Sequence, residues 1–117
     1  GPFVRANITA AQVKAAMAPY TDCTCKIDQR VPVYLKTTLS LIRPLYQLVA
    51  KGEFRDATAE AKAFTAQRLA AGATAARDMI EDAWKASATA SVGYPNINVA
   101  DIESGKVILT RDSYGSD

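Results

Sequence analysis

Apolar side chains recur at spacings of three and four residues in three segments of the chain, which is the period of a helix with one buried face. The three predicted helices cover residues 9–18, 32–51 and 57–88, and an irregular tail follows at 92–117. We therefore expect an all-α fold, in which residues 1–117 form one domain that resembles an antiparallel three-helix bundle with a kinked central helix.

The first predicted helix carries a start signal and a stop signal. Thr9 and Gln12 have the spacing of a capping box, in which both side chains bind backbone N–H groups at the start of a helix. Pro19 disfavours helical geometry in the residue before it, so the helix should end near Ala18.

The central predicted helix, 32–51, is the most apolar. Pro32 fits its first turn, where a missing N–H costs nothing, and Gly52 follows as a stop. Pro44 leaves the carbonyl of Ser40 without its helical donor, so we expect a kink there. The main buried stripe should contain Leu35, Leu39, Ile42, Tyr46 and Val49. Four further apolar side chains widen it: Tyr34, Leu41, Leu45 and Leu48.

The third predicted helix, 57–88, is the longest. Gly72 costs about 1 kcal/mol relative to alanine inside a helix, so we expect the backbone of the central helix to approach closely there. Glu81 and Lys85 have the favourable acid-before-base order for a surface ion pair. The expected buried stripe contains Ala61, Phe64, Leu69, Ala73, Ala76, Met79 or Ile80, Ala83 and Trp84.

The tail after Ser91 changes character. Residues 92–96 predict a loop, Val99–Glu103 a short turn or helix, and 107–109 a short strand that would need a partner.

Charge and hydropathy exclude two classes of partner. Fourteen basic against twelve acidic side chains give a formal charge of +2, too small a field to draw nucleic acid to this chain alone. The longest apolar stretch, 31–50, is interrupted by Lys36, Arg43 and Pro44, so no membrane span is expected.

The candidate chemistry is sparse. The chain has no histidine, which removes the commonest general base and the commonest metal ligand. We assign no catalytic, cofactor-binding or metal-ligating residue. Asp78, Glu81 and Asp82 cluster on one turn and are interpreted as a solvated face. Asp78 and Asp82, four residues apart on the same side of the helix, could alternatively bind a hard cation. The aromatic side chains Tyr34, Tyr46, Phe54, Phe64 and Trp84 are spaced as core residues.

The two cysteines, Cys23 and Cys25, are separated by one residue, a spacing too short for a relaxed disulfide between them. A disulfide to another segment or chain, two free or reactive thiols, and two of the four ligands of a zinc site all remain open.

The segment from 40 to 88 resembles the closing helices of the S1/P1 nucleases and the related zinc-dependent phospholipase C-like proteins, which are secreted. The likeness rests on Pro44-Leu45-Tyr46-Gln47-Leu48, on Lys51-Gly52-Glu53-Phe54, on 64–73 with its Arg68-Leu69-Ala70-Ala71-Gly72-Ala73 run, and on Ala83-Trp84. It implies a noncatalytic C-terminal helical portion of a metal-dependent phosphodiesterase, located in the periplasm or outside the cell. The zinc ions and their histidine ligands would lie in a missing N-terminal part, which this chain would need as its partner for activity.

The competing hypothesis makes the chain a structural or protein-interaction module. In this interpretation an exposed apolar stripe either forms a homo-oligomer or packs against a partner chain.

Overall fold

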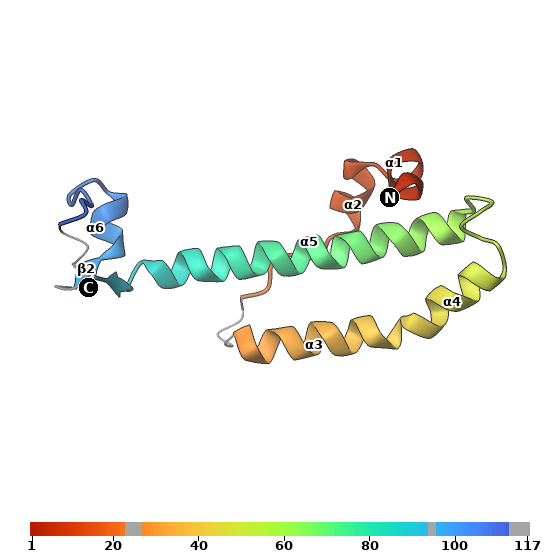
Figure 1. Cartoon of the computed structure of the whole chain (residues 1–117), viewed down its shortest axis with the longest axis horizontal. Helices are drawn as coiled ribbons and strands as arrows, with labels where there is room; N and C mark the ends of the chain where they lie inside the picture. Colours follow the sequence, from red (N-terminus) through yellow and green to blue (C-terminus); the bar gives the residue numbers. More distant parts are fainter. Residues whose placement is uncertain (23–26, 94–95, 113–117) are drawn as a thin grey trace. The chain divides into compact units, whose positions relative to one another are not determined.

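The computed structural model describes residues 1–22, 27–93 and 96–112, and this part of the chain is mostly helical, with a small two-stranded sheet near the C-terminus (Figure 1). The chain divides into two units, 1–79 and 80–117. The helices are α1 (Pro2–Asn7), α2 (Ala10–Ala16), α3 (Ile27–Ser40), α4 (Ile42–Ala50), α5 (Ala59–Ser87) and α6 (Val99–Glu103), and the strands are β1 (Ser91–Val92) and β2 (Ile97–Asn98).

Helix α2 begins with the expected capping box. The backbone N–H of Gln12 donates to Thr9 Oγ1 at 3.2 Å, and the backbone N–H of Thr9 donates to Gln12 Oε1 at 2.8 Å. Helix α1, which precedes it, was not expected. Its signal is Pro2 in the first turn, a position that tolerates the missing N–H.

Helix α3 begins at Ile27, so the prediction that the central helix starts near Pro32 is wrong. Proline inside a helix removes the hydrogen bond to the carbonyl four residues earlier, here that of Asp28. The extra turn before Pro32 carries Arg30, whose Nη1 lies 3.8 Å from Asp78 Oδ2 on α5. We attribute the longer helix to this tertiary contact, which the local sequence cannot reveal.

The central segment is divided at Leu41, as the missing N–H of Pro44 leads one to expect. Leu41 donates its N–H to the carbonyl of Thr38 at 3.1 Å, and α4 restarts at Ile42. Pro44 then lies in the first turn of α4, where the helix requires no donor.

Helix α4 ends at Ala50 with Lys51 as its C-cap, and Gly52 follows with a φ of +79°, in the left-handed region that glycine adopts without strain. Gly52 donates its N–H to the carbonyl of Val49 at 3.0 Å, and Glu53 donates to that of Leu48 at 3.1 Å, the two bonds of a Schellman motif. In the loop that follows, hydrogen bonds from Arg55 lower the pKa of Asp56.

Helix α1 packs against the loop that follows α4 through an aromatic contact. The rings of Phe3 and Phe54 meet edge to face with centroids 5.2 Å apart. A second attachment lies beyond α2, where Ala18 donates its backbone N–H to Thr74 Oγ1 of α5 at 3.2 Å.

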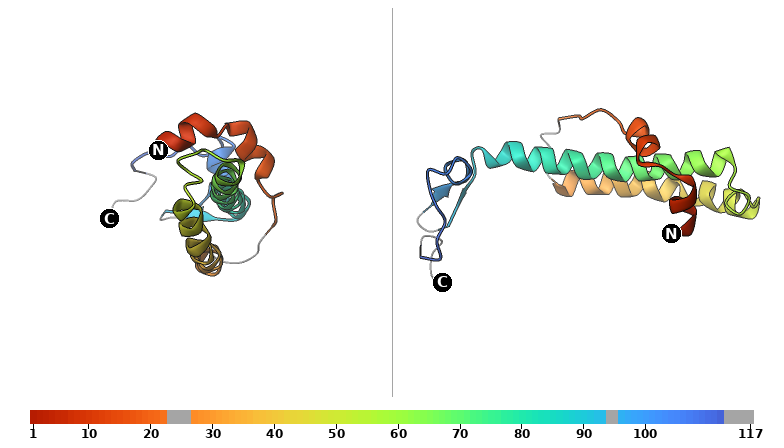
Figure 2. Two further views of the ribbon diagram at one scale, coloured as in Figure 1. Left: turned by 90° about the vertical axis from the view of Figure 1, so that its right-hand side faces the viewer. Right: turned by 90° about the horizontal axis from the view of Figure 1, so that it is seen from above.

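Helices α3 and α5 run antiparallel within the first unit (Figures 1 and 2). As residue numbers rise along α3, those of its partners on α5 fall: Arg30 meets Asp78, Tyr34 lies over Gly72, and Thr38 Oγ1 accepts from Arg68 Nη2 at 3.2 Å. The buried apolar residues in the described part of the chain are Leu48, Ala61 and Ala70. This core is thin, because small residues form the α5 side of it.

We expect Gly72→Ala to stabilise the protein. The neighbour at Gly72 is a side chain and not the backbone that the sequence predicted, because an added Cβ would lie 3.6 Å from the hydroxyl of Tyr34, an ordinary contact distance. Alanine is better than glycine in a helix by up to about 1 kcal/mol, and urea unfolding should reveal a gain of that order.

The matched control for this prediction is Gly52→Ala, which should lower stability by about 1 kcal/mol because its positive φ is strained for an L-residue. There the new Cβ would also lie 2.8 Å from Arg55 Nη2. Equal destabilisation by both substitutions would mean that the α3–α5 contact at Gly72 is closer than described.

The second unit contains the sheet. Ser91 pairs with Asn98 and Val92 with Ile97 in antiparallel register, and Asn98 Oδ1 caps α6 by accepting from the N–H of Ala100 at 2.8 Å. The predicted strand at 107–109 is not found. Val107 instead donates its N–H to the carbonyl of Asp101 on α6 at 3.1 Å, which occupies the donor that a strand would use.

Candidate protein-interaction face

Five apolar side chains of α3 and α4 form a line that is open to solvent, which we call the apolar ridge. Each is between 47% and 68% exposed. They follow one another at steps of four, three, four and three residues. The ridge consists of Leu35, Leu39, Ile42, Tyr46 and Val49. The sequence predicted these residues as the main buried stripe, and that prediction is wrong.

A second line of residues lies next to the ridge, on the side of α3 and α4 that faces α5. Leu48 is buried, and Tyr34, Thr38 and Leu41 are half-buried. Three of these four belong to the set that was expected merely to widen the stripe. Two apolar lines therefore lie next to each other on this segment. The line with Leu48, which has the less regular apolar spacing, packs inward because it contacts Arg68, Gly72 and the alanines of α5.

Helix α5 agrees with its predicted stripe near its start and departs from it further on. Ala61 is fully buried and Phe64, Ala73 and Met79 are half-buried, but Leu69 and Ala76 are exposed. In the second unit Ile80, Ala83 and Trp84 are exposed. The aromatic residues Tyr46 and Trp84 therefore do not belong to the core, whereas Phe54 contacts Phe3.

The flank of the apolar ridge is basic. Lys36 and Arg43 are exposed, and each follows a ridge residue by one position, seven residues apart. This repeat places both on the same side of the ridge. The sequence from Gln29 to Gly52 contains no aspartate or glutamate.

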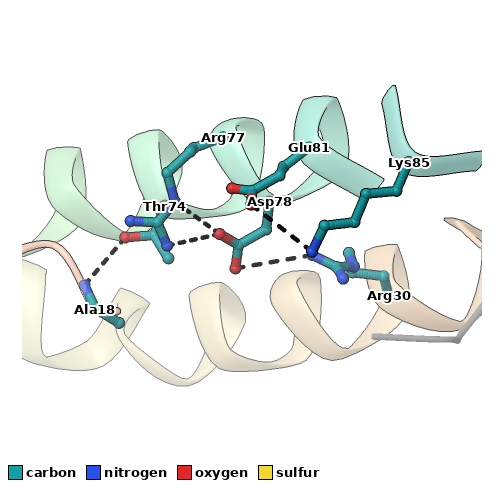
Figure 3. Close-up of polar contacts among 7 residues, drawn as sticks. All are labelled: Ala18, Arg30, Thr74, Arg77, Asp78, Glu81 and Lys85. Carbon is teal, nitrogen blue, oxygen red and sulfur yellow. Dashed lines mark hydrogen bonds and ion pairs between the residues drawn. The ribbon is translucent and has the colours of Figure 1, made fainter. Parts of the chain in front are cut away.

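The inner side of α3 carries a different feature, a buried ion-pair cluster (Figure 3). Asp78 is buried, its Oδ1 accepts from Arg77 Nε at 2.9 Å and from Arg77 Nη2 at 2.6 Å, and its Oδ2 lies 3.8 Å from Arg30 Nη1. The interpretation of Asp78 as part of a solvated face is therefore wrong. In the second unit the predicted surface pair is confirmed, with Lys85 Nζ 3.7 Å from Glu81 Oε1.

A groove of about 770 Å³ runs beside this cluster within the first unit. Its walls come from α3, from α5 and from the segment around α2, with Val33, Ala71 and Ala75 among the apolar residues and Arg30 and Asp78 among the polar ones. Both charged groups already bind each other, so the groove offers a ligand mainly apolar surface.

A metal site and a membrane-spanning helix each place requirements on the described residues. Residues 1–22, 27–93 and 96–112 contain no group of three or more acids, cysteines or histidines that could hold a metal ion. Over the same residues, none of the helices combines the length and the apolar character needed to cross a bilayer. Cys23 and Cys25, the candidate thiols, lie outside the described residues.

Comparison with known proteins does not extend this picture. No family model, no curated protein and no solved structure matches the chain. The resemblance to the nuclease and phospholipase C-like family stays a prediction from residues 40–88.

Proposed function

We propose that this chain is a helical interaction module whose apolar ridge packs against a helix of another polypeptide chain. The observation that carries the proposal is the exposure of all five ridge side chains on one continuous line. Scattered exposed leucines are ordinary on protein surfaces, whereas a contiguous patch of several hundred Å² commonly marks an interaction site.

The spacing of the ridge supports a helical partner. Steps of three and four residues are the seam positions of a coiled coil, where each side chain inserts between four residues of the facing helix. A standard interface buries about 800 Å² on each partner, and the aliphatic stems of Lys36 and Arg43 would add to the apolar area that the ridge contributes.

The proposal also accounts for the thin core. Helices α3, α4 and α5 bury little apolar surface between themselves, and a partner helix on the ridge would bury the line that the chain leaves outside. The antiparallel three-helix bundle that the sequence predicts from residues 9–18, 32–51 and 57–88 stays part of the proposal, and the partner helix would pack on the outside of it, against the ridge.

A synthetic helix tests this function. We expect the chain to bind a fluorescent peptide that has leucine at heptad seam positions and glutamine at the flanking positions, measured by anisotropy as the chain is added. Replacing Leu39 and Tyr46 together by serine should weaken binding at least tenfold, because burial of each side chain contributes about 1.5–3 kcal/mol when complete.

The control is the double variant Val33→Ser with Leu69→Ser, which removes two exposed apolar side chains that lie outside the ridge. Its affinity should match that of the unaltered chain. Absence of saturable binding up to about 100 μM, or an equal loss in both double variants, would refute the assignment of the ridge.

A further inference from the structure

We infer that the partner helix carries acidic side chains along the edge that faces Lys36 and Arg43. The inference rests on the proposed function and adds the chemistry of the partner. Both basic groups are exposed, lie one position after Leu35 and Ile42, and repeat after seven residues. A helix docked on the ridge would therefore meet both of them on the same edge.

Charge complementarity argues for acids on that edge. Flanking charges in coiled coils select the partner, since opposite charges add a modest attraction and like charges repel. No acidic side chain lies between Gln29 and Gly52, and Asp28, the acid of α3, lies eight residues before Lys36. An acidic edge on the partner helix would supply the opposite charge.

A second copy of this chain is a poorer occupant than an acidic helix. In an antiparallel pair of ridges, Lys36 and Arg43 would face the same two residues of the other copy, and like charges would meet. In a parallel pair they would face Val31 and Thr38, neither of which is acidic. Both arrangements leave the basic flank without a counter-charge.

An anionic membrane surface is also a poorer occupant. Interfacial helices bury a broad apolar face and usually carry many basic residues, each of which contributes about 1 kcal/mol. Val31, Val33 and Leu45 of α3 and α4 are also exposed, but Tyr34, Leu41 and Leu48 lie toward α5, so the apolar surface does not extend around these helices. Two flanking basic residues give a weak attraction to a bilayer.

Two peptides that differ only in flanking charge test the inference. Both have the leucine seam described above, one with glutamate and the other with lysine at the flanking positions. We expect the chain to prefer the glutamate helix by about tenfold at roughly 50 mM salt, and the preference should shrink at high salt because exposed charges are screened. The double variant Lys36→Glu with Arg43→Glu should prefer the lysine helix.

The control is Arg5→Glu with Lys14→Glu, which changes net charge equally at exposed positions on α1 and α2. It should keep the preference for the glutamate helix. Binding of the glutamine helix with no preference between the charged helices would overturn the inference and leave the proposed function intact.

Two further results would overturn the inference in other ways. The first is reversible dimerisation of the chain in sedimentation equilibrium that the substitutions Leu39→Ser and Tyr46→Ser abolish, with no binding to the peptides. The second is tighter binding to phosphatidylcholine vesicles containing phosphatidylserine than to the glutamate helix.

Discussion

Replacing Asp78 by alanine should lower the free energy of unfolding by about 1–2 kcal/mol, because it leaves the partly buried guanidinium groups of Arg30 and Arg77 without their carboxylate. The carboxylate binds Arg77 at 2.6 Å and lies 3.8 Å from Arg30, and its side chain is 10% exposed. Stability of domains is usually about 5–15 kcal/mol, so a loss of this size is a readily measured share of the total. Urea unfolding followed by circular dichroism measures it.

Glu81→Ala is the matched control for Asp78→Ala. It removes an acid from the same helix, but the ion pair of Glu81 with Lys85 is half-exposed and contributes no more than about 0.5 kcal/mol. Equal effects of the two substitutions would show that the Asp78 cluster does not hold α3 against α5.

The helix signals in the sequence located several ends correctly because each depends on a short stretch of chain. Thr9 and Gln12 form their capping box, and Gly52 closes α4. In each case the hydrogen-bonding groups lie within a few residues of one another. Local hydrogen bonding was therefore sufficient to predict these helix ends from the sequence.

The buried face of the central segment could not be read in the same way. Apolar residues occupy most of the circumference of α3 and α4, and periodicity alone ranks the ridge above the neighbouring line with Leu48. Which of the two lines is buried depends on the side chains of α5 that pack against it, and these are glycine, alanine and Arg68. That complementarity is a property of two segments far apart in the sequence.

Asp78 illustrates a related limit. Its neighbours Glu81 and Asp82 suggested a solvated acidic face, since charged residues are rarely buried without a partner. The partner from α3 is Arg30, which lies on a turn that was not expected to be helical because Pro32 follows it. One error about the start of α3 thus hid the site of the ion pair.

The arrangement of the first unit links packing to the proposed function. The α5 side of the contact with α3 and α4 consists largely of alanine and glycine, so this contact buries few large side chains. The larger apolar residues of α3 and α4 then remain outside, where they can bind a partner. The alanine and glycine residues of α5 therefore account both for the thin core and for the exposed ridge.

A pair of leucine substitutions separates the two lines of α3 and α4 energetically. Leu48→Ala should cost the isolated chain about 2–3 kcal/mol, because Leu48 is 6% exposed and its truncation leaves a cavity against α5. Leu39→Ala removes the same atoms from a position that is 64% exposed, and it should change stability by less than about 0.5 kcal/mol. Both values come from urea unfolding of the chain without peptide. The reverse order would mean that the ridge is the true core line, and a ridge that packs inward could not bind a partner helix.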